Sequence, residues 1–455
     1  MFANVHRSSN HKAVDPKSAL GSAARIVERL MRGYEGGAEV RIGELRRQVG
    51  RLPPTFALQV QDVSVLRELI MHPDPIHLAD AYFRGAIEIE GDFFQALTLK
   101  SHFERLALDW RDKVALAIDA LRLPGAGSSD RTESFARRVA RSFSHTHTKS
   151  TDQAAIAFHY DVSNEFYQLW LDEQMVYSCA YFTRWDESLE NAQRNKLDHI
   201  CRKLRLNPGE RLLDVGCGWG ALVCWAAKNY GVTAHGITLS RRQLEYARAR
   251  VLAEGLEKQV TVELCDYRDL PAENCYDKVS SIGMFEHVGL ANMAAYIASV
   301  RRVLKPGGLF LNHGITHDED GWNKTLASEF INRYVFPDGE LDRVSNIQLG
   351  MERGGFEILD VEALRPHYAI TLRHWASRLE ARKDAAIREV DEPTYRIWHL
   401  YLAACALEFE SGGTGIYQIL ASKPDSGRWP VPLTRADLYP STELAHSAQV
   451  DSMGG

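Results

Sequence analysis

The sequence predicts an α/β protein, with a doubly wound parallel sheet of the Rossmann type and a smaller α+β domain before it. From about residue 195, strand-like and helix-like segments alternate, and such alternation is typical of a parallel sheet with right-handed crossovers. A glycine-rich turn, residues 216–220, follows the first of these strands. A segment rich in glycine and serine, residues 123–130, separates this region from an N-terminal region with its own short strands and helices.

The composition excludes several classes of protein. At 455 residues the chain is long enough for two or three domains. No apolar run approaches the roughly 20 residues that a membrane span requires, and residues 1–13 contain no apolar signal core. Seven cysteines without CxxC pairs indicate reduced thiols and no metal site. Because the net charge of -6 also disfavours nucleic-acid binding, we expect a cytoplasmic protein that binds neither nucleic acid nor metal.

Five segments are expected along the chain. They are a flexible tail, an N-terminal domain, a linker, the α/β domain and a second flexible tail, at residues 1–24, 25–122, 123–152, 153–423 and 424–455. Within the N-terminal domain, residues 55–62 are predicted as a strand. Residues 92–108 are predicted as one amphipathic helix that Asp92 caps.

One part of the linker, residues 131–143, has the pattern of an amphipathic helix. Three apolar residues spaced four apart alternate with three arginines, namely Phe135, Val139 and Phe143 with Arg137, Arg138 and Arg141. On a helix this pattern gives an apolar stripe flanked by arginines, as in helices that lie on a membrane surface. It fits equally well a basic helix that packs on its own protein.

The α/β domain is predicted element by element. An apolar strand enters the glycine turn at residues 211–218, and the series continues with helix 221–231, strand 232–240, helix 241–255 and strands 260–266, 278–285 and 308–315. Residues 372–423 predict two helices and a last strand, and the second helix is apolar nearly all round, so that it is buried or lines an acyl pocket. Ligands of such sheets bind at the carboxyl ends of the strands.

The glycine turn indicates which cofactor the sheet binds. Its spacing is GxGxG rather than the GxGxxG of dinucleotide-binding proteins, and "HGITLS" at the end of the second strand lacks the acid that an NAD site requires. Asp214, just before the first glycine, is instead typical of methyltransferases that use S-adenosylmethionine (SAM). Asp266 and Tyr267, after the third strand, suit the exocyclic amine and the ring face of an adenine. The turn therefore predicts a SAM-dependent methyltransferase.

A series of motifs then points to one family. Between His159 and Gln418 the chain contains, in order, "HYDVSNEFY", "YSCAYF", "LLDVGCGWG", "GITLSRRQ", "CDYRDL", "GMFEHVG", "LKPGG", "NHGIT" and "HYAITL". In these motifs it resembles the cyclopropane fatty acid synthase family, which includes the mycolic acid cyclopropane synthases. The N-terminal "AYFRGAIEIEGDFFQAL" resembles the extra domain of the branch that acts on bacterial phospholipids.

The resemblance implies a fold, an activity and partners. It implies a seven-stranded class I SAM-dependent methyltransferase domain that transfers a methylene group to the cis double bond of an acyl chain in membrane phospholipid. It further implies that the N-terminal domain docks on lipid, that the enzyme associates peripherally with the inner face of the membrane, and that it is a homodimer.

The resemblance also implies site residues, carried over motif by motif. A bicarbonate ion would be held by Cys179, Glu286, His313, the backbone of Ile315 and Tyr368. Together with Asp214 and Asp266, the cofactor would be held by Tyr177, Ser178, Gly216, Gly218, Thr238, Leu239, Gln243, Tyr267 and Gly283. Taken singly, a residue such as Cys179 is most often a small buried hydrophobe, His313 fits a hydrogen-bonded histidine at a strand end, and Tyr368 fits a core tyrosine.

The chemistry explains why such residues are needed. An alkene is a poor nucleophile, so the methyl group must be presented to it in a dry pocket. The attack leaves a carbocation that a strongly nucleophilic base would trap, whereas a small oxyanion held by hydrogen-bond donors can take up the proton. Residues 279–289 read as a buried strand that ends in Glu286 and His287. We expect Glu286 to orient the anion, and His287 to point the other way and be structural.

Three alternatives stay open at this level. The same cation could lose its proton elsewhere, giving a methyl- or methylene-branched chain without a ring. A small-molecule N-methyltransferase could share the α/β domain, although such an enzyme needs no lipid-docking domain. A lipid-binding protein could retain the fold without catalysis, although it would not need the complete set of motif residues.

Overall fold

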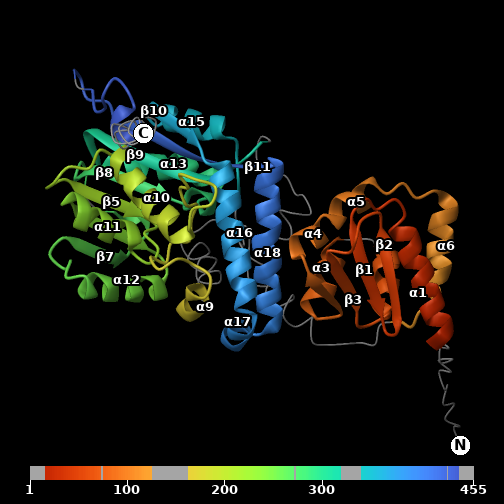
Figure 1. Cartoon of the computed structure of the whole chain (residues 1–455). Helices are drawn as coiled ribbons and strands as arrows, with labels where there is room; N and C mark the ends of the chain where they lie inside the picture. The colour runs from red at the N-terminus through yellow and green to blue at the C-terminus, as the bar shows by residue number, and fades with distance from the viewer. Residues whose placement is uncertain are drawn as a thin grey trace, which may run out of the picture. The chain divides into compact units, whose positions relative to one another are not determined.

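The computed structural model describes residues 16–72, 75–125, 162–270, 273–318, 340–427 and 429–439. The chain divides into two compact units, Met1–Val139 with Glu392–Ile397, and Ala140–Asp391 with Trp398–Gly455. Each unit is a separate body with its own sheet (Figure 1). The amphipathic pattern predicted at residues 131–143 lies outside the described residues, as does most of the predicted linker.

The first unit is an α+β domain around a four-stranded sheet in the order β2-β1-β3-β4. Its elements are α1 (Pro16–Leu30), β1 (Gly37–Ile42), β2 (Leu45–Gly50), β3 (Phe56–Val60), α2 (Ser64–Met71), α3 (Pro75–Phe83), β4 (Ile87–Gly91), α4 (Phe93–Leu97), α5 (Leu99–Arg105) and α6 (Trp110–Leu121). Strand β1 pairs antiparallel with β2 and parallel with β3, and β3 pairs antiparallel with β4. The strand predicted at residues 55–62 is confirmed as β3.

Two predictions for this unit are wrong. Residues 16–24, predicted as part of a flexible tail, belong to α1, which packs on α6 through buried Ala23 and Ile26. Asp92 does cap a helix, by accepting a hydrogen bond from the Gln95 N–H at 3.0 Å, but the helix predicted over 92–108 breaks at Thr98 into α4 and α5. The Thr98 hydroxyl donates to the Gln95 carbonyl at 2.6 Å, and such local bonds compete with a continuing helix.

The second unit is the predicted doubly wound α/β domain, with a seven-stranded sheet in the order β10-β11-β9-β8-β5-β6-β7. Its elements are α9 (Asn164–Gln168), α10 (Leu189–Lys203), β5 (Arg211–Val215), α11 (Ala221–Tyr230), β6 (Thr233–Thr238), α12 (Arg241–Ala253), β7 (Val260–Leu264), β8 (Tyr276–Ile282), α13 (Met293–Val303), β9 (Leu304–His317), α15 (Val344–Arg353), β10 (Glu357–Ala363), α16 (Arg365–Ala381), α17 (Lys383–Val390), α18 (Glu392–Ser411) and β11 (Thr414–Ser422). Strands β5 to β9 are parallel, and β11 runs antiparallel to both of its neighbours.

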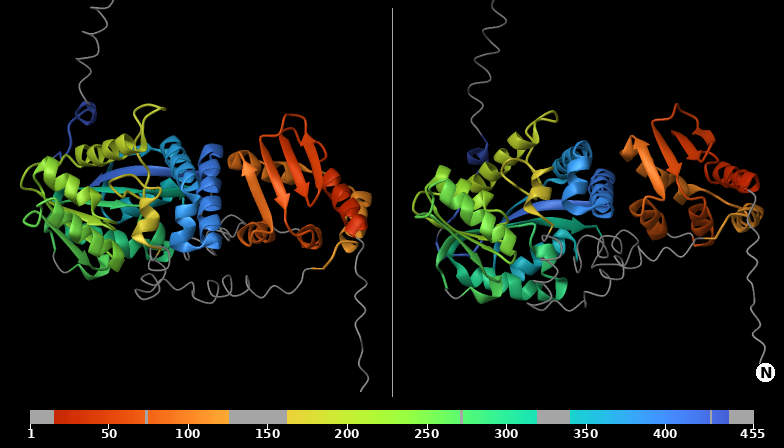
Figure 2. Two further views of the ribbon diagram at one scale, coloured as in Figure 1. Left: turned by 60° about the horizontal axis from the view of Figure 1, so that its bottom comes forward. Right: turned by 90° about the horizontal axis from the view of Figure 1, so that it is seen from below.

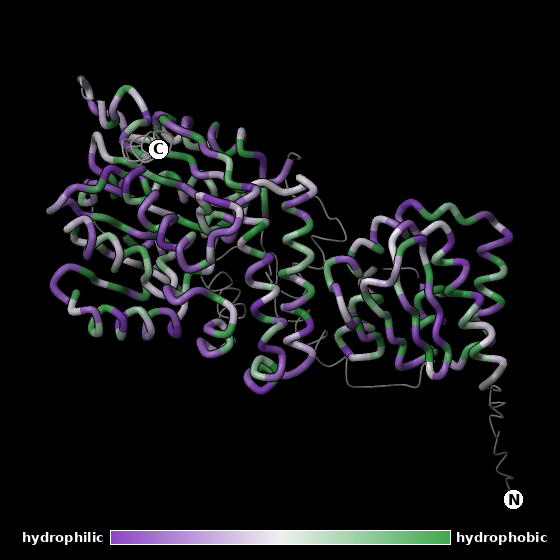
Figure 3. The backbone as a smooth tube through the Cα atoms, viewed as in Figure 1, coloured by the Kyte–Doolittle hydropathy of each residue, from purple (hydrophilic) through white to green (hydrophobic). Residues whose placement is uncertain are grey.

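Helices cover both faces of this sheet, as the two views in Figure 2 show. Residues that alternate along one strand contribute to opposite cores: Leu212 packs with α10, α11 and α12, whereas Leu213 packs with α13 and α15. The central strands are largely buried, β5 at every residue except Arg211 and β8 at every residue except Asp277 and Ile282. Both strands nevertheless include polar residues, such as Asp214, Lys278 and Ser280, so the colour of this region is mixed in Figure 3. Burial on both faces is typical of strands in doubly wound sheets.

Three details of this unit differ from the sequence prediction. Residues 372–423 contain parts of three helices, because α16 begins at Arg365 and α17 precedes α18. The predicted tail from residue 424 is wrong in part, since Leu438 is 2% exposed and Asp437 pairs with Arg205 at 3.0 Å. The predicted strand 278–285 ends at Ile282, where Gly283 takes a φ of +61°.

Candidate active site

The carboxyl ends of the parallel strands open onto one pocket, and the glycine turn after β5 forms its floor. Gly216 and Gly218 have φ angles of +79° and +54°, a region that glycine enters without strain. The N–H groups of Gly216 and Cys217 donate to the Ile237 carbonyl at 3.0 and 2.9 Å, which ties the turn to β6. A Cβ on Gly216 would lie 3.1 Å from the Met284 side chain. The turn therefore brings bare backbone to the pocket.

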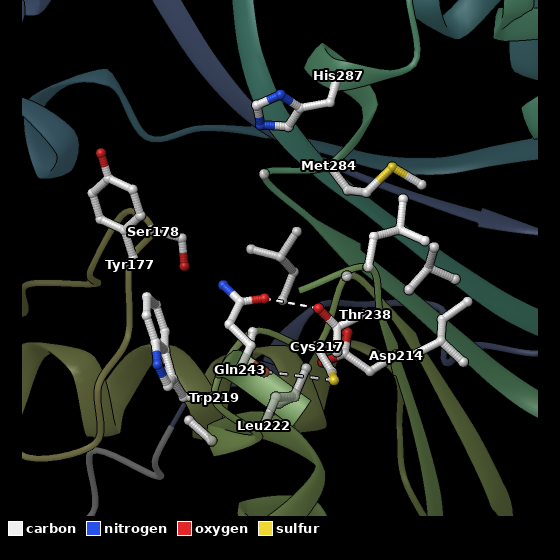
Figure 4. Close-up of a pocket in the computed structure, with 18 of the residues that line it drawn as sticks. Tyr177, Ser178, Asp214, Cys217, Trp219, Leu222, Thr238, Gln243, Met284 and His287 are labelled. Atoms are coloured by element: carbon white, nitrogen blue, oxygen red, sulfur yellow. Dashed lines mark hydrogen bonds between the residues drawn. The ribbon is translucent and has the colours of Figure 1, made fainter. Parts of the chain in front are cut away.

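All the residues predicted to hold the cofactor line this single pocket. They are Tyr177, Ser178, Asp214, Gly216, Gly218, Thr238, Leu239, Gln243, Asp266, Tyr267 and Gly283. Figure 4 shows Tyr177, Ser178 and Trp219 on one side of the pocket, Asp214 and Thr238 on the other, and Met284 and His287 at the upper edge. These residues come from the ends of four parallel strands, from the segment before α10 and, for Gln243, from the first turn of α12, so the residues present fit a nucleoside-type cofactor such as SAM.

Asp214 lies at the end of β5 and is 3% exposed. Its Oδ1 accepts a hydrogen bond from the Ser280 hydroxyl on neighbouring β8 at 2.7 Å. Burial raises the pKa of Asp214 to about 6, because desolvation disfavours the carboxylate. A buried acid with one hydrogen-bond donor can accept a further bond from a polar ligand group.

The loop after β7 has a different arrangement from the one expected. Both carboxylate oxygens of Asp266 accept hydrogen bonds from the Arg268 guanidinium, at 2.8 and 2.6 Å. The same guanidinium lies 5.2 Å from the centre of the Tyr267 ring. At the end of neighbouring β6, the Thr238 hydroxyl donates to Gln243 Oε1 at 2.8 Å, which fixes that amide (Figure 4).

The pocket is also lined by residues that the sequence prediction did not assign to it, among them Lys196, Trp219 and His287. The prediction that His287 points away along a strand is wrong, because residues 285–287 form a 3-10 turn that follows Gly283. Trp219 belongs to the glycine turn, and its Nε1 donates to Asn164 at 2.8 Å. Trp219 is visible in the sequence as an aromatic residue inside the glycine turn, and on that ground it could have been predicted to line the pocket.

Glu286 lies just outside the cofactor pocket and is 6% exposed. Its Oε1 accepts a hydrogen bond from the Ile315 backbone N–H at 2.8 Å, whereas its buried Oε2 has no partner among the described residues. Burial raises the pKa of Glu286 to about 7. The carboxyl group therefore exchanges a proton near neutral pH, with one oxygen fixed and the other available.

His313 lies on β9 beside the end of β8, where its carbonyl accepts from the Gly283 N–H at 2.8 Å. The Gln418 amide donates to His313 Nδ1 at 3.2 Å, so the neutral ring carries its proton on Nε2. This Nε2 is buried and has no partner among the described residues. Burial, reinforced by the charge of Lys196, lowers the pKa of His313. The ring is therefore a neutral donor whose N–H is unused.

Cys179 and Tyr368 both contact the carbonyl of Leu364, the residue just before α16. Cys179 is fully buried, and its Sγ lies 3.9 Å from the carbonyl of Leu364, which also accepts the Tyr368 N–H at 3.1 Å. Burial raises the pKa of the Cys179 thiol, so it stays protonated and is no nucleophile. The ring of Tyr368 packs on Trp375 and Phe409 at 6.0 and 4.8 Å between ring centres.

An aromatic wall adjoins these polar groups. Tyr177 lies 5.2 Å from Trp375 and 5.3 Å from Trp170, measured between ring centres, and Tyr167 contacts Trp219 and Trp398 in the same way. Edge-to-face and tilted aromatic contacts of this kind are favourable. Since Tyr368 packs on Trp375 and Tyr177 precedes Cys179 by two residues, this wall adjoins Tyr368 and Cys179.

No helix in the described part of the chain combines the length and hydropathy needed to cross a membrane. Within the same residues, no group of three or more His, Cys, Asp or Glu side chains is arranged to hold a metal ion.

Comparison with known proteins places the chain among lipid-modifying methyltransferases. The family model of mycolic acid cyclopropane synthetases matches residues 147–419. A probable fatty acid methyltransferase from Pseudomonas putida is 45% identical over 389 residues, which are 85% of this chain and 92% of that protein. Cyclopropane-fatty-acyl-phospholipid synthase from Escherichia coli (strain K12) is 40% identical over 265 residues, 58% of this chain and 66% of that protein.

A solved structure agrees with the sequence relatives. The mycolic acid cyclopropane synthase CmaA1, complexed with SAH and CTAB, superimposes with a TM-score of 0.56 at 34% identity. The match covers 60% of this chain and 98% of that one.

Proposed function

Because the chain belongs to the mycolic acid cyclopropane synthetase family of SAM-dependent methyltransferases, we propose that it converts the cis double bond of an unsaturated phospholipid acyl chain into a cyclopropane ring. The observation that carries this proposal is that two buried polar atoms, Glu286 Oε2 and His313 Nε2, have no partner among the described residues. Both residues lie close to Gly283 of the cofactor pocket, Glu286 three residues later in the chain and His313 through its carbonyl. Such atoms are costly to bury unless a ligand satisfies them. The bicarbonate ion of the family suits this need.

Bound SAM supplies an electrophilic methyl group, and bound bicarbonate supplies a weakly nucleophilic base. The chain's own residues hold and orient these groups. His313 Nε2–H is a neutral donor that an anion can accept from, since Gln418 occupies the other ring nitrogen. Glu286 has its Oε1 fixed by Ile315, so its Oε2 can donate when protonated or accept the anion's proton when ionised.

The neutrality of these residues serves the reaction. A thiolate, an unprotonated amine or an exposed carboxylate would trap a carbocation on the acyl chain. Cys179 stays a thiol because it is buried, and the aromatic wall around Tyr177 and Trp375 excludes water. Tyr368, packed on the same wall, would contribute its hydroxyl to the anion.

The test uses the purified full chain with SAM and vesicles of unsaturated phospholipid. We expect release of S-adenosylhomocysteine, and fatty acid methyl esters heavier by one CH₂ in gas chromatography–mass spectrometry. Vesicles of saturated phospholipid are the control and should give neither product. Release of S-adenosylhomocysteine without any modified acyl chain would contradict the proposed substrate.

A second outcome is favoured by one comparison. The Pseudomonas putida relative, which matches 85% of this chain, is named a fatty acid methyltransferase rather than a cyclopropane synthase. The same initial methyl transfer, followed by loss of a different proton, gives a methyl- or methylene-branched acyl chain. Ring and branch have distinct mass spectra after chemical opening of the ring, so the same experiment separates them.

We also propose that the first unit docks on the lipid surface through α6. Four apolar residues are exposed on one face of this helix at helical spacing: Trp110 at 70%, Val114 at 49%, Ile118 at 46% and Leu121 at 60%. The opposite face, with Leu116 and Ala120, is buried in the core of the unit.

The charges around this face favour an anionic lipid surface as its partner. Arg111 and Lys113 are exposed on the same helix, and the Arg111 guanidinium lies 5.5 Å from the Trp110 ring centre. Arg122, just after the helix, is exposed as well but pairs with Asp119 at 3.6 Å. Tryptophan and arginine at the edge of an apolar helix face are typical of membrane-surface helices. Docking there would bring the phospholipid substrate to the enzyme.

A further inference from the structure

Lys196 is a buried cation that faces the cofactor pocket. It lies on α10, is 2% exposed and belongs to the pocket lining. Its Nζ donates to the Ser178 hydroxyl at 2.9 Å. No carboxylate oxygen of the described residues lies within 4.0 Å of this Nζ, so Lys196 has no ion-pair partner there. An unpaired ammonium in such a place is costly unless a ligand pairs with it.

The nearby acids are engaged elsewhere. Asp172 accepts from the Gln174 and Val176 N–H groups at 2.8 and 2.9 Å, and Asp214 accepts from Ser280. Both act on Lys196 only through space. Burial lowers the pKa of Lys196 to about 8, so the ammonium form still dominates at pH 7.

Ser178 contributes a second polar group to the part of the pocket around Lys196. Its carbonyl accepts from the Gln193 side chain at 2.9 Å, which holds the segment against α10. Its side chain lies on the opposite side of the pocket from Thr238 (Figure 4). The pocket therefore has a nucleoside side near Tyr267 and, away from it, a corner in which a lysine ammonium and a serine hydroxyl meet.

We propose that Lys196 and Ser178 form an anion subsite that binds the carboxylate at the amino-acid end of the methyl donor. This inference rests on the proposed function, because it assumes that the pocket binds SAM. A carboxylate placed there would pair with the ammonium and would separate it from the positively charged sulfonium. Charge-assisted hydrogen bonds of this type are stronger than neutral ones. A bicarbonate ion has the same anion chemistry, and the test below separates the two sources.

The test compares two ligands and two variants by isothermal titration calorimetry. The ligands are S-adenosylhomocysteine and its decarboxylated analogue, which lacks only the carboxylate. We expect Lys196→Met to weaken S-adenosylhomocysteine binding about 10- to 100-fold, and to change binding of the decarboxylated analogue less than about threefold. Methionine matches the lysine stem in shape, so thermal unfolding of the ligand-free variant should not occur at a lower temperature than in the wild type.

Lys203→Met is the matched control. Lys203 lies on the same helix and is 1% exposed, but it pairs with Glu362 and does not line the pocket. Its loss should lower the unfolding temperature, because Glu362 loses a partner, and should affect both ligands equally.

Each contrary result has a distinct meaning. Equal weakening of both ligands by Lys196→Met would overturn the proposal, since Lys196 would then only shape the pocket. Unchanged S-adenosylhomocysteine binding, together with a raised bicarbonate requirement for turnover, would overturn it in favour of bicarbonate. If the wild-type chain bound neither ligand, the proposed function itself would fail.

Discussion

Replacing Glu286 with glutamine should raise the free energy of unfolding of the second unit above that of the wild type, and by more at pH 8 than at pH 5. The size of this difference follows from the burial of the carboxyl group. Its side chain is 6% exposed, and its Oε2 has no partner among the described residues. Burial raises the pKa of Glu286 from 4.5 to about 7. Glutamine keeps an oxygen that can accept from the Ile315 N–H, so the variant removes the charge while retaining the fixed hydrogen bond.

The sign and magnitude follow from proton linkage. Below pH 4.5 the carboxyl group is protonated in both the folded and the unfolded chain. Between pH 4.5 and 7 the folded chain holds a proton that the unfolded chain has released, so the free energy of unfolding falls as the pH rises. One pKa unit corresponds to about 1.4 kcal/mol, so the wild type should lose roughly 2 to 3 kcal/mol between pH 5 and pH 8 through Glu286 alone.

The assay is urea unfolding of the ligand-free chain at pH 5 and pH 8, followed by tryptophan fluorescence. Trp170 and Trp375 are fully buried in the second unit and report on it. Other groups titrate over this range in both proteins, so the quantity of interest is the difference between variant and wild type at each pH. Glu245→Gln, at an exposed position on α12, is the control. If the Glu286→Gln difference were the same at both pH values, the reasoning about its buried charge would be refuted.

Three further predictions concern the reaction, the cofactor and the membrane. His313→Gln should lower turnover about 100-fold or more and leave the S-adenosylhomocysteine Kd within about threefold; a matching loss of binding would place His313 in the cofactor site instead. Gly216→Ala should weaken S-adenosylhomocysteine binding about tenfold, because φ is +79° and the new Cβ would crowd Met284; wild-type affinity in calorimetry would argue against a backbone cradle. Exchanging Val114 and Ile118 on α6 for glutamate should reduce sedimentation with anionic vesicles about tenfold or more, while turnover on detergent-dispersed lipid is retained; unchanged sedimentation would exclude this face as the docking surface.

Sequence reasoning performed best where local pattern and backbone geometry agree. The strands and helices from β5 to β9 follow from apolar runs and from the glycines between them. The residues predicted to hold the cofactor line one pocket because parallel strands end at the same edge of the sheet. Both results depend on periodicity and on topology rather than on side-chain contacts.

It failed where one residue changes the direction of the chain. Residues 279–289 contain no proline, and the two serines in this stretch precede Ile282, so neither marks the end of the strand. Gly283 nevertheless ends it at φ +61°, and the following 3-10 turn sends Glu286 inward to Ile315 and His287 to the pocket. The alternation of side chains along a strand would place Glu286 and His287 on opposite faces of the sheet. It therefore could not predict that Glu286 reaches Ile315 while His287 lines the pocket.

Lys196 illustrates a signal that was present but unused. The apolar positions of α10 include Leu189, Leu197 and Ile200, and a helical period places Lys196 on the same face. A lysine on a buried stripe is rare enough to require a partner. The partner itself, the Ser178 hydroxyl 18 residues earlier in the chain, depends on tertiary packing that no periodicity describes.

Burial acts in the same direction on three of the proposed catalytic residues. It raises the pKa of Cys179 and of Glu286 and lowers the pKa of His313, so burial shifts each group toward its neutral form in the folded chain. A neutral site next to an apolar wall stabilises no carbocation by charge, but it offers that cation no strong nucleophile either. Under the proposed function, the proton acceptor is a separate small anion, held by donors such as His313 Nε2–H. In such a site the position of the anion, rather than the identity of the protein residues, decides which proton leaves. Ring closure and branching can therefore arise from the same set of side chains, and a change that moves the anion should alter the ratio of products more than the rate of methyl transfer.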